Sequence, residues 1–249
     1  MKVNNGDIFQ IGNHTVGCGD SLDKEFVAKV IGAKKIKVIL TDPPYGVAYV
    51  ENKKNFAKIG ADENKVIAND HLQSEEEYEV FTRKYLGAVI PFLEEYNACY
   101  IFNSDLMFSA LRTGMKHAGF YYSQMLIWMK NQPVMSRKDY LSQHELIAYG
   151  WFGKHKLQRS KSKNVIVYPR PQKSKLHPTQ KPIGLLRKII PDNTRVGDVI
   201  YDPFLGSGST CIASHHLGRT CIGIELDVEY VKIIIKRLEK LTGKKAIRL

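Results

Sequence analysis

The chain has 249 residues, 43% hydrophobic and 25% charged, which is enough for one large hydrophobic core. No signal peptide and no apolar run long enough to cross a bilayer is present, so we expect a cytoplasmic protein without a membrane anchor. The formal charge of +12 favours a polyanionic partner, nucleic acid before a membrane surface, although a merely basic protein would carry the same charge. The four cysteines have no Cys-x-x-Cys spacing and three lie in or beside apolar runs, which predicts reduced core thiols and no bound metal.

The first informative element is a short apolar run at 37–41, typical of a buried parallel strand, which is followed directly by Asp42-Pro43-Pro44-Tyr45. Ligands of open α/β sheets bind at the carboxyl ends of such strands. The residue before a proline is kept out of the helical region and proline has no N–H, so this corner stays extended with free carbonyl oxygens. A carboxylate, carbonyls and an aromatic ring suit a planar ring that bears an amino group. The structural alternative is an ordinary strand-ending turn.

Residues 46–70 are polar with little apolar periodicity, which predicts a long mobile loop. A capping-box pattern predicts that a helix starts at Ser74, and Gly243 is expected to end the last helix. Strand-like and helix-like segments alternate between these points, which predicts a mostly parallel α/β sheet covered on both faces. The expected strands are 98–102, 124–128, 145–149, 198–201 and 220–224, and the expected helices are 105–117, the segment after Pro182, 213–217 and 227–241.

Regular patterning stops between residues 151 and 176, where basic residues are interleaved with aromatic ones. Such a mixture suits nucleic-acid contact through phosphates and base stacking, but a solvated loop of the same composition is an equal alternative. The basic residues expected to contact nucleic acid, from this segment and from the loop at 46–70, are Lys53, Lys54, Lys154, Lys156, Arg159, Lys161 and Lys163.

A Gly-Ser-Gly turn at 206–208 lies between an expected strand and helix, and Glu225 ends the following strand. This is the layout of a nucleotide site, in which glycines let the backbone approach the ligand and the acid binds ribose hydroxyls. A dinucleotide site would have a third glycine at the position of Cys211. Asp202 would repel a pyrophosphate but could meet an ammonium group. The turn therefore favours S-adenosylmethionine over NAD, the cofactor of an alternative oxidoreductase.

Four motifs in this order resemble the amino-methyltransferases that modify DNA. They are Asp42-Pro43-Pro44-Tyr45, His-Pro-Thr-Gln-Lys-Pro at 177–182, the turn at 202–210 and Gly-Ile-Glu-Leu-Asp at 223–227. With the catalytic motif first and the cofactor turn last, their order is similar to that of the β class of this family. The resemblance runs over nearly the whole chain. It implies a single Rossmann-like methyltransferase domain over 1–249, a mostly parallel sheet with one antiparallel strand near an edge, and a target-recognition insertion at 151–176.

The resemblance also implies roles for individual residues. In the catalytic motif, Tyr45 would stack on an adenine flipped out of duplex DNA, Asp42 and the Pro43 carbonyl would accept its amino hydrogens, and Pro44 would keep the corner rigid. We expect Asp42 chiefly to orient the nitrogen. Final transfer of the proton to Asp42 is the alternative, but a carboxylate with a depressed pKa is a poor base. S-Adenosylmethionine, which becomes S-adenosylhomocysteine, would contact Asp20, Thr179, Lys181, Asp202, Phe204, Gly206, Ser207, Gly208, Ser209, Thr210 and Glu225.

An aspartate at position 42 is more similar to the adenine-N6 enzymes than to the cytosine-N4 enzymes. Adenine methylation is therefore the expected reaction, and cytosine-N4 methylation is the near alternative. A catalytically inactive DNA-binding module on the same fold is an alternative of a different class. Double-stranded DNA is the expected partner, with a homodimer and a cognate restriction endonuclease as further candidates.

Overall fold

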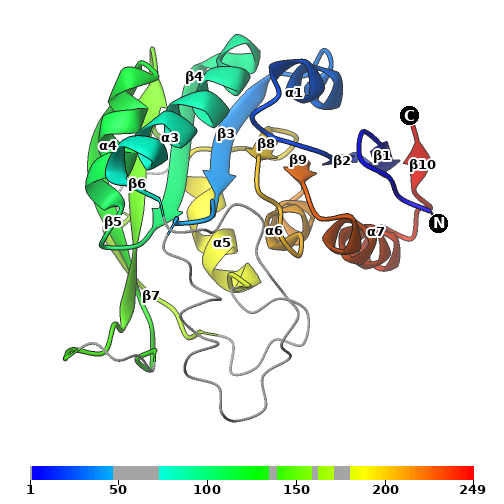
Figure 1. Ribbon diagram of the computed structural model, residues 1–249. Helices are drawn as coiled ribbons and strands as arrows, with labels where there is room; N and C mark the ends of the chain where they lie inside the picture. The colour runs from blue at the N-terminus through cyan, green and yellow to red at the C-terminus, as the bar shows by residue number, and fades with distance from the viewer. Residues whose placement is uncertain (1, 47–72, 135–138, 159–161, 171–179) are drawn as a thin grey trace, which may run out of the picture.

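The computed structural model describes residues 2–46, 73–134, 139–158, 162–170 and 180–249. These residues form one mixed sheet of ten strands with helices on both faces (Figure 1). The strands lie in the order β10-β1-β2-β9-β8-β3-β4-β6-β5-β7. Their bounds are β1 Ile8–Ile11, β2 His14–Cys18, β3 Ile36–Thr41, β4 Leu93–Asn103, β5 Phe120–Met129, β6 His144–Phe152, β7 Val165–Val167, β8 Val199–Asp202, β9 Thr220–Glu225 and β10 Ile247–Arg248.

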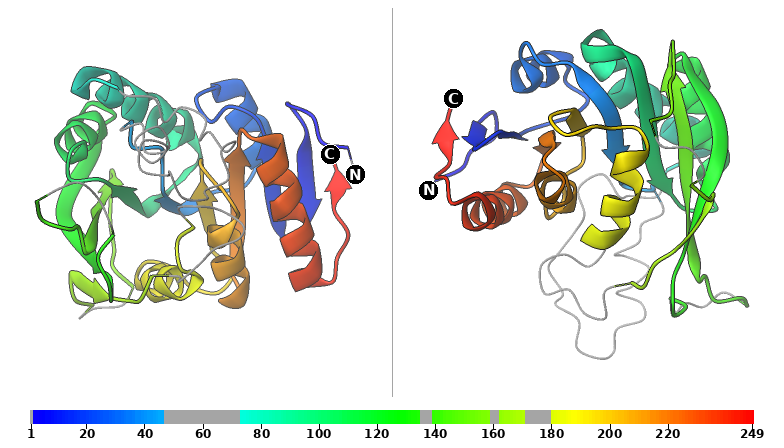
Figure 2. Two further views of the ribbon diagram at one scale, coloured as in Figure 1. Left: turned by 60° about the horizontal axis from the view of Figure 1, so that its bottom comes forward. Right: turned by 180° about the vertical axis from the view of Figure 1, so that it is seen from behind.

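The helices form two layers, one on each face of the sheet (Figure 2). One layer holds α1 (Lys24–Ile31), α3 (Glu75–Val89) and α4 (Phe108–His117). The other holds α5 (Ile183–Ile189), α6 (Ser209–His216) and α7 (Val228–Thr242). Single 3-10 turns, Ile90–Phe92 and Ile190–Asp192, follow α3 and α5. Among the described helices, none has both the length and the apolar character to cross a membrane.

The central strands are buried on both faces, which explains their continuous apolar runs. Side chains alternate along a strand, so Val38 and Leu40 of β3 pack in the cluster that faces α5 and α6, whereas Ile39 packs in the cluster that faces α1, α3 and α4. The four cysteines are buried and free, with the Cys211 and Cys221 sulfurs 3.0 Å apart. This confirms the prediction of unpaired core thiols.

Helix ends follow the chemistry predicted for them. The Ser74 side chain accepts from the Glu77 N–H and the Glu77 carboxylate accepts from the Ser74 N–H, which is the predicted capping box of α3. Gly243 ends α7 in the left-handed region with φ of 68°. α6 begins at Ser209 instead of the expected 213, because Gly208 takes a left-handed conformation and turns the chain into the helix four residues earlier.

The direction of the strands departs from the prediction at one end of the sheet. β6 runs antiparallel to both β4 and β5, and it corresponds to the one antiparallel strand expected near an edge. β1 is a second reversed strand in the described part, because an N-terminal hairpin pairs β1 with β2 beside β9. The remaining pairs from β2 through β9, β8 and β3 to β4 are all parallel.

Several elements differ in length from the expected ones, and β7 lies inside the segment at 151–176. β4 starts at Leu93 instead of 98, where the charged Glu94 and Glu95 conceal the strand pattern. There Lys37 of β3 pairs with Glu94 at 3.1 Å. β6 extends to Phe152 instead of 149, and β5 starts at Phe120 instead of 124. α4 begins at Phe108, three residues after the expected start.

Replacing the α3 cap tests how this helix is held. Ser74→Ala removes the acceptor for the Glu77 N–H and should lower the free energy of unfolding by about 1 kcal/mol. Denaturant unfolding measures the change. Ser109→Ala, at an exposed serine in the first turn of α4, is the matched control and should change stability by much less. Equal effects of the two substitutions would contradict the assigned cap.

Candidate active site

Four acidic residues follow four adjacent parallel strands. Asp20 comes two residues after β2, Glu225 ends β9, Asp202 ends β8, and Asp42 follows β3 directly. Parallel strands bring their carboxyl ends to one edge, so these carboxylates share that edge of the sheet. Direct bonds join neighbours: the Gly19 N–H donates to the Glu225 carbonyl at 3.0 Å, and the Thr41 hydroxyl donates to Asp202 at 2.8 Å. The predicted adjacency of the catalytic strand β3 and the cofactor strand β8 is confirmed.

A cluster of charged groups surrounds Asp42. The Lys181 ammonium donates to Asp42 Oδ2 at 2.5 Å, and the Tyr45 hydroxyl donates to Asp42 Oδ1 at 2.7 Å. Lys181 also lies 3.0 Å from Glu145 Oε2, and Lys130 lies 2.7 Å from Glu145 Oε1. The side chains of Lys181 and Lys130 are only 8% and 7% exposed, so both ammonium groups depend on these carboxylates for solvation.

The two carboxylates of this cluster are pushed in opposite directions. Burial raises the pKa of the Asp42 carboxyl, the Lys181 charge opposes that rise, and the negative charge of Glu145 adds to it. Burial also disfavours ionised Glu145, but Lys181 and Lys130 outweigh it and leave the pKa of Glu145 below its ordinary value. The cations Lys181 and Lys130 thus favour the ionised form of Glu145, whereas the burial of Asp42 opposes the charge that Lys181 favours.

Asp202 is buried at the end of β8 and links three parts of the site. One of its oxygens accepts from both the Thr41 hydroxyl and the Phe204 N–H, at 2.8 and 3.1 Å. Burial raises the pKa of Asp202 to about 6, although hydrogen bonds from Thr210, Thr41 and the Phe204 backbone favour the ionised form. Asp202 thus fixes β3 against the start of the glycine turn.

The glycine turn is held by Glu225. Its carboxylate accepts from the Gly206 N–H at 2.7 Å and from the Asp227 N–H at 2.9 Å. Burial raises the pKa of Glu225 to about 7 despite these two bonds, and the charges of Asp227 and Asp202 add to the rise. Gly206 and Gly208 have φ of 53° and 82°, a region where L side chains are strained.

Two further contacts join the turn to its surroundings. The Arg237 guanidinium of α7 donates to the Ser207 carbonyl, and the Gln180 amide donates to the Ser209 hydroxyl at 3.3 Å. Gln180 precedes Lys181, so the segment that supplies the Asp42 partner is also tied to the turn. Ser207, Ser209 and Thr210 are themselves buried.

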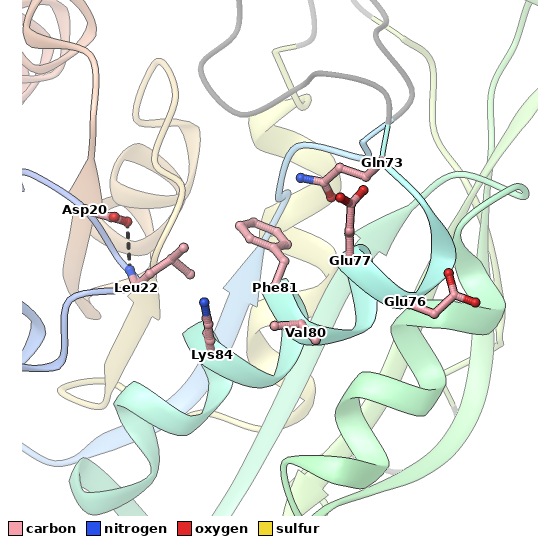
Figure 3. Close-up of a pocket in the computed structure, with 8 residues that line it drawn as sticks. All are labelled: Asp20, Leu22, Gln73, Glu76, Glu77, Val80, Phe81 and Lys84. Carbon is pink, nitrogen blue, oxygen red and sulfur yellow. Dashed lines mark hydrogen bonds between the residues drawn. The ribbon is translucent and has the colours of Figure 1, made fainter.

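A pocket of about 460 Å³ opens between the end of β2 and α3 (Figure 3). Asp20 and Leu22 form one side, and Phe81 projects between them and Gln73 (Figure 3). The Phe81 ring packs on Phe204 of the glycine turn, with ring centroids 5.5 Å apart. The other residues that line the pocket are Glu76, Glu77, Val80 and Lys84.

The structure separates part of the predicted DNA-binding set from the corner. Lys154 pairs with Glu95 at 2.6 Å, and the Lys154 carbonyl accepts from the Asn97 N–H. Asn97 is six residues before Asn103 at the carboxyl end of β4, about 20 Å along the strand. Lys156 lies at the same edge. Two residues after it, the Gln158 N–H donates to the carbonyl of Asp192, which precedes the start of β8. Lys154 and Lys156 thus lie at the edge opposite to Asp42.

Other predicted residues lie outside the described part, and two residues of the Asp42 cluster were not predicted. Thr179, Lys53, Lys54, Arg159 and Lys161 are outside the described residues, as are 47–70 of the predicted loop. Lys163 is exposed next to Asn164, whose carbonyl accepts from the Ile127 N–H of β5. Lys181 was expected at the cofactor, but its ammonium contacts Asp42. The sequence offered one signal for Glu145 and Lys130, which is that each is a charged residue at the border of an apolar strand.

Comparison with known proteins identifies the family. The DNA methylase family model N6_N4_Mtase matches residues 36–236. The chain belongs to this family of DNA methylases. M2.DpnII, a type II methyltransferase of Streptococcus pneumoniae, is 28% identical to this methylase over 83% of each chain. The type II methyltransferase M.HinfI of Haemophilus influenzae is 25% identical over 97% of this chain and 71% of its own length.

A solved structure supports the same assignment. The M1.HpyAVI–SAM complex is 26% identical to this methylase and has a TM-score of 0.65, covering 90% of this chain and 98% of that one. The predicted α/β methyltransferase fold and the predicted membership among DNA amino-methyltransferases are both confirmed. The four carboxylates at the sheet edge are therefore the candidate active site of a DNA methyltransferase.

The raised pKa of Asp202 predicts a pH-dependent cost to folding. Its pKa is about 6 in the folded methylase against an ordinary value of 3.8, so the stabilisation from the protonated form is complete below about pH 4 and is lost as pH rises through 6. Asp202→Asn cannot ionise. The free energy of unfolding of Asp202→Asn, minus that of wild type, should therefore increase by about 1 kcal/mol from pH 5 to pH 8.

Chemical unfolding of ligand-free protein at the two pH values measures this change. Subtracting wild type from variant removes the contributions of all other titrating groups. A difference between variant and wild type that is the same at both pH values would contradict a buried Asp202 that ionises at a cost.

Proposed function

We propose that this methylase transfers a methyl group from S-adenosylmethionine to the N6 amino group of adenine in duplex DNA. The observation that carries the proposal is the meeting of two sites at one sheet edge. The Asp42 corner after β3 suits an amino-bearing ring, and the glycine turn after β8 suits a nucleotide. The Thr41–Asp202 hydrogen bond joins them. A donor held at the turn would then stand beside a base held at the corner.

The residues at the turn fit S-adenosylmethionine. Asp202 and Glu225 have raised pKa values and no basic side chain pairs with them in the described ranges, so a cationic ligand would stabilise their ionised forms. Phe204 and the pocket residue Phe81 offer apolar surface to an adenosyl group. The related M1.HpyAVI was crystallised with SAM. We assign Asp20, Phe204, Glu225 and the 206–210 turn to the cofactor.

When bound, S-adenosylmethionine supplies a methyl group on a cationic sulfur, whose bond to that carbon breaks as the amino nitrogen bonds to it, leaving S-adenosylhomocysteine. The chain's contribution is to prepare the nitrogen. Its lone pair is conjugated with the ring, and hydrogen bonds to Asp42 and the Pro43 carbonyl would pull the amino group out of that conjugation. The positive charge that develops on nitrogen is then stabilised by the Asp42 carboxylate, more strongly in the transition state than before it.

We propose a change to one part of the expected mechanism. We expected a depressed pKa for Asp42 and hence a weak base, but burial and the neighbouring Glu145 raise its pKa. A carboxylate with a raised pKa is a better proton acceptor. We therefore propose that Asp42 both orients the amino group and takes the proton that nitrogen loses after methylation, before releasing it to solvent.

The choice of adenine rests on the aspartate at position 42, which resembles the adenine-N6 enzymes. Cytosine-N4 methylation is the alternative, because the same acceptors would hold a cytosine amino group. Either base must leave the duplex stack to reach this edge of the sheet, with Tyr45 as the stacking partner. A catalytically inactive DNA-binding module is opposed by the complete hydrogen-bonded set around Asp42, and it would bind S-adenosylmethionine without transferring its methyl group.

Duplex DNA is the proposed partner, in keeping with the net charge of +12. M.HinfI and M2.DpnII are type II methyltransferases, which supports a place for this chain in restriction–modification. We propose a cognate endonuclease and a homodimer as further partners.

Loss of the Asp42 carboxylate tests the reaction and its base together. Asp42→Ala should abolish methylation, by at least about 100-fold, while cofactor binding persists. Modification-sensitive sequencing of DNA from cells that express wild type or Asp42→Ala reports the modified base and its site. Asp198→Ala, at the opposite end of β8, is the matched control and should methylate normally. Substantial methylation by Asp42→Ala would defeat the role of this carboxylate. Detection of N4-methylcytosine as the product would make cytosine, and not adenine, the substrate.

The position of the basic residues predicts which of them contact DNA. Lys53→Ala with Lys54→Ala, shortly after the Asp42 corner in sequence, should weaken binding to a labelled duplex and reduce the salt slope by about 0.9 per lost phosphate contact. Lys154→Ala with Lys156→Ala should leave both nearly unchanged, because these residues lie at the opposite edge. The reverse result would show that DNA wraps to the far edge of the sheet.

A further inference from the structure

Lys181 is surrounded by oxygen atoms at the Asp42 corner. Its ammonium lies 2.5 Å from Asp42 Oδ2, 3.0 Å from Glu145 Oε2 and 3.3 Å from the Tyr45 hydroxyl. It also lies over the rings of Tyr45 and Phe102, 5.7 and 5.1 Å from their centroids. An ammonium group is strongly hydrated in solution, and the Lys181 side chain is only 8% exposed, so these partners in the described residues replace most of its water.

Glu145 is the second partner of Lys181, and it is fixed from the other side. Lys130, directly after β5, contacts Glu145 at 2.7 Å and lies over the Trp128 ring. The charges therefore alternate in a row from Lys130 through Glu145 and Lys181 to Asp42. The row is neutral overall, and it crosses from the end of β5 and the start of β6 to the end of β3.

This row ends on the one carboxylate that is proposed to touch the substrate. Apolar side chains would avoid the cost of burying four charges, so stability alone does not explain the row. What the row achieves is a defined orientation of Asp42: Lys181 holds Oδ2, so that Oδ1 is the oxygen presented away from it.

We propose that Lys181 and Glu145 are positioning residues for Asp42, an inference that rests on the proposed methyl transfer. Lys181 keeps Asp42 ionised and occupies Oδ2, and the substrate amino group takes Oδ1. In the structure Oδ1 accepts from the Tyr45 hydroxyl at 2.7 Å, and that hydroxyl is also 3.3 Å from Glu145 Oε2. Glu145 thus receives the Tyr45 hydroxyl when the base displaces it from Asp42.

The pH dependence of activity should reveal this arrangement, because charged neighbours set the protonation of Asp42. The titratable groups that face the corner are Lys181, Glu145, Lys130, Tyr45, Tyr78 of α3 and Asp202 of β8. Of these, Lys181 is the cation in direct contact with Asp42, and Glu145 is the anion nearest to that contact.

Lys181→Met removes the cation from Asp42. The kcat for transfer of a tritiated methyl group to unmethylated genomic DNA should fall by about 100-fold at pH 7. The acid limb of the kcat–pH profile should move to higher pH by about one to three pH units, because Asp42 without its cation stays protonated longer. Lys181→Arg keeps the charge and should keep the acid limb near that of wild type.

Glu145→Gln removes the neighbouring anion and leaves Lys181 to Asp42 alone. Its acid limb should therefore move to lower pH, opposite to that of Lys181→Met, with a smaller loss of kcat. A purely structural role would lower kcat in both variants without moving the limbs in opposite directions. Lys37→Met is the matched control, because Lys37 lies at the other end of β3 and pairs with Glu94.

The outcomes separate the two proposals. Absence of methyl transfer by the wild type would refute the proposed function. Transfer by the wild type together with an unmoved acid limb in Lys181→Met, or with limbs that move the same way, would refute the positioning role alone. Thermal unfolding and binding of S-adenosylmethionine check that each variant is folded. If Lys181→Met does not fold, the direction of the shift in Glu145→Gln decides the question by itself.

Discussion

Parallel pairing of β2, β9, β8 and β3 forces the ends of four strands, each with a following carboxylate, to one edge of the sheet. Asp20 is exposed, but the other three carboxylates are partly or fully buried, repel one another and lose water, so each of the three requires its own compensation. Asp202 receives the Thr41 hydroxyl, Glu225 receives two backbone amides, and Asp42 receives Lys181. The geometry of the active site follows from how these separate requirements are met.

The three compensations differ in charge, and this difference divides the edge into two functional halves. Asp42 has a cation of its own, whereas Asp202 and Glu225 have neutral donors and no ion pair in the described residues. Burial raises their pKa values to about 6 and 7, and their hydrogen-bond donors only partly oppose the rise. A cationic ligand at the turn would return both acids to the ionised form. The half without a cation is therefore suited to a cationic donor, and the half with one is suited to a neutral base.

Local chemistry was predictable from the sequence, whereas long-range pairing was not. The proline corner at Asp42, the turn before α6 and the Ser74 cap depend on consecutive residues, so their patterns were readable. The Lys181–Glu145 contact joins residues 36 positions apart, and neither neighbourhood points to the other. Composition also does not reveal strand direction, and for this reason the position of Lys154 and Lys156 relative to Asp42 was not predictable.

The reversed strand β6 explains both the contact between Lys181 and Glu145 and the position of Lys154 and Lys156. Because it runs against β4, its first residues lie beside the end of β4, and Glu145 thereby reaches the active-site edge. For the same reason its last residues lie at the far edge and carry the chain to Lys154. The chain then returns through β7, which pairs in parallel with the end of β5, so that Arg170 donates its N–H to Asn131 just beyond β5. A single strand reversal thus supplies Lys181 with its second carboxylate and moves Lys154 and Lys156 away from Asp42.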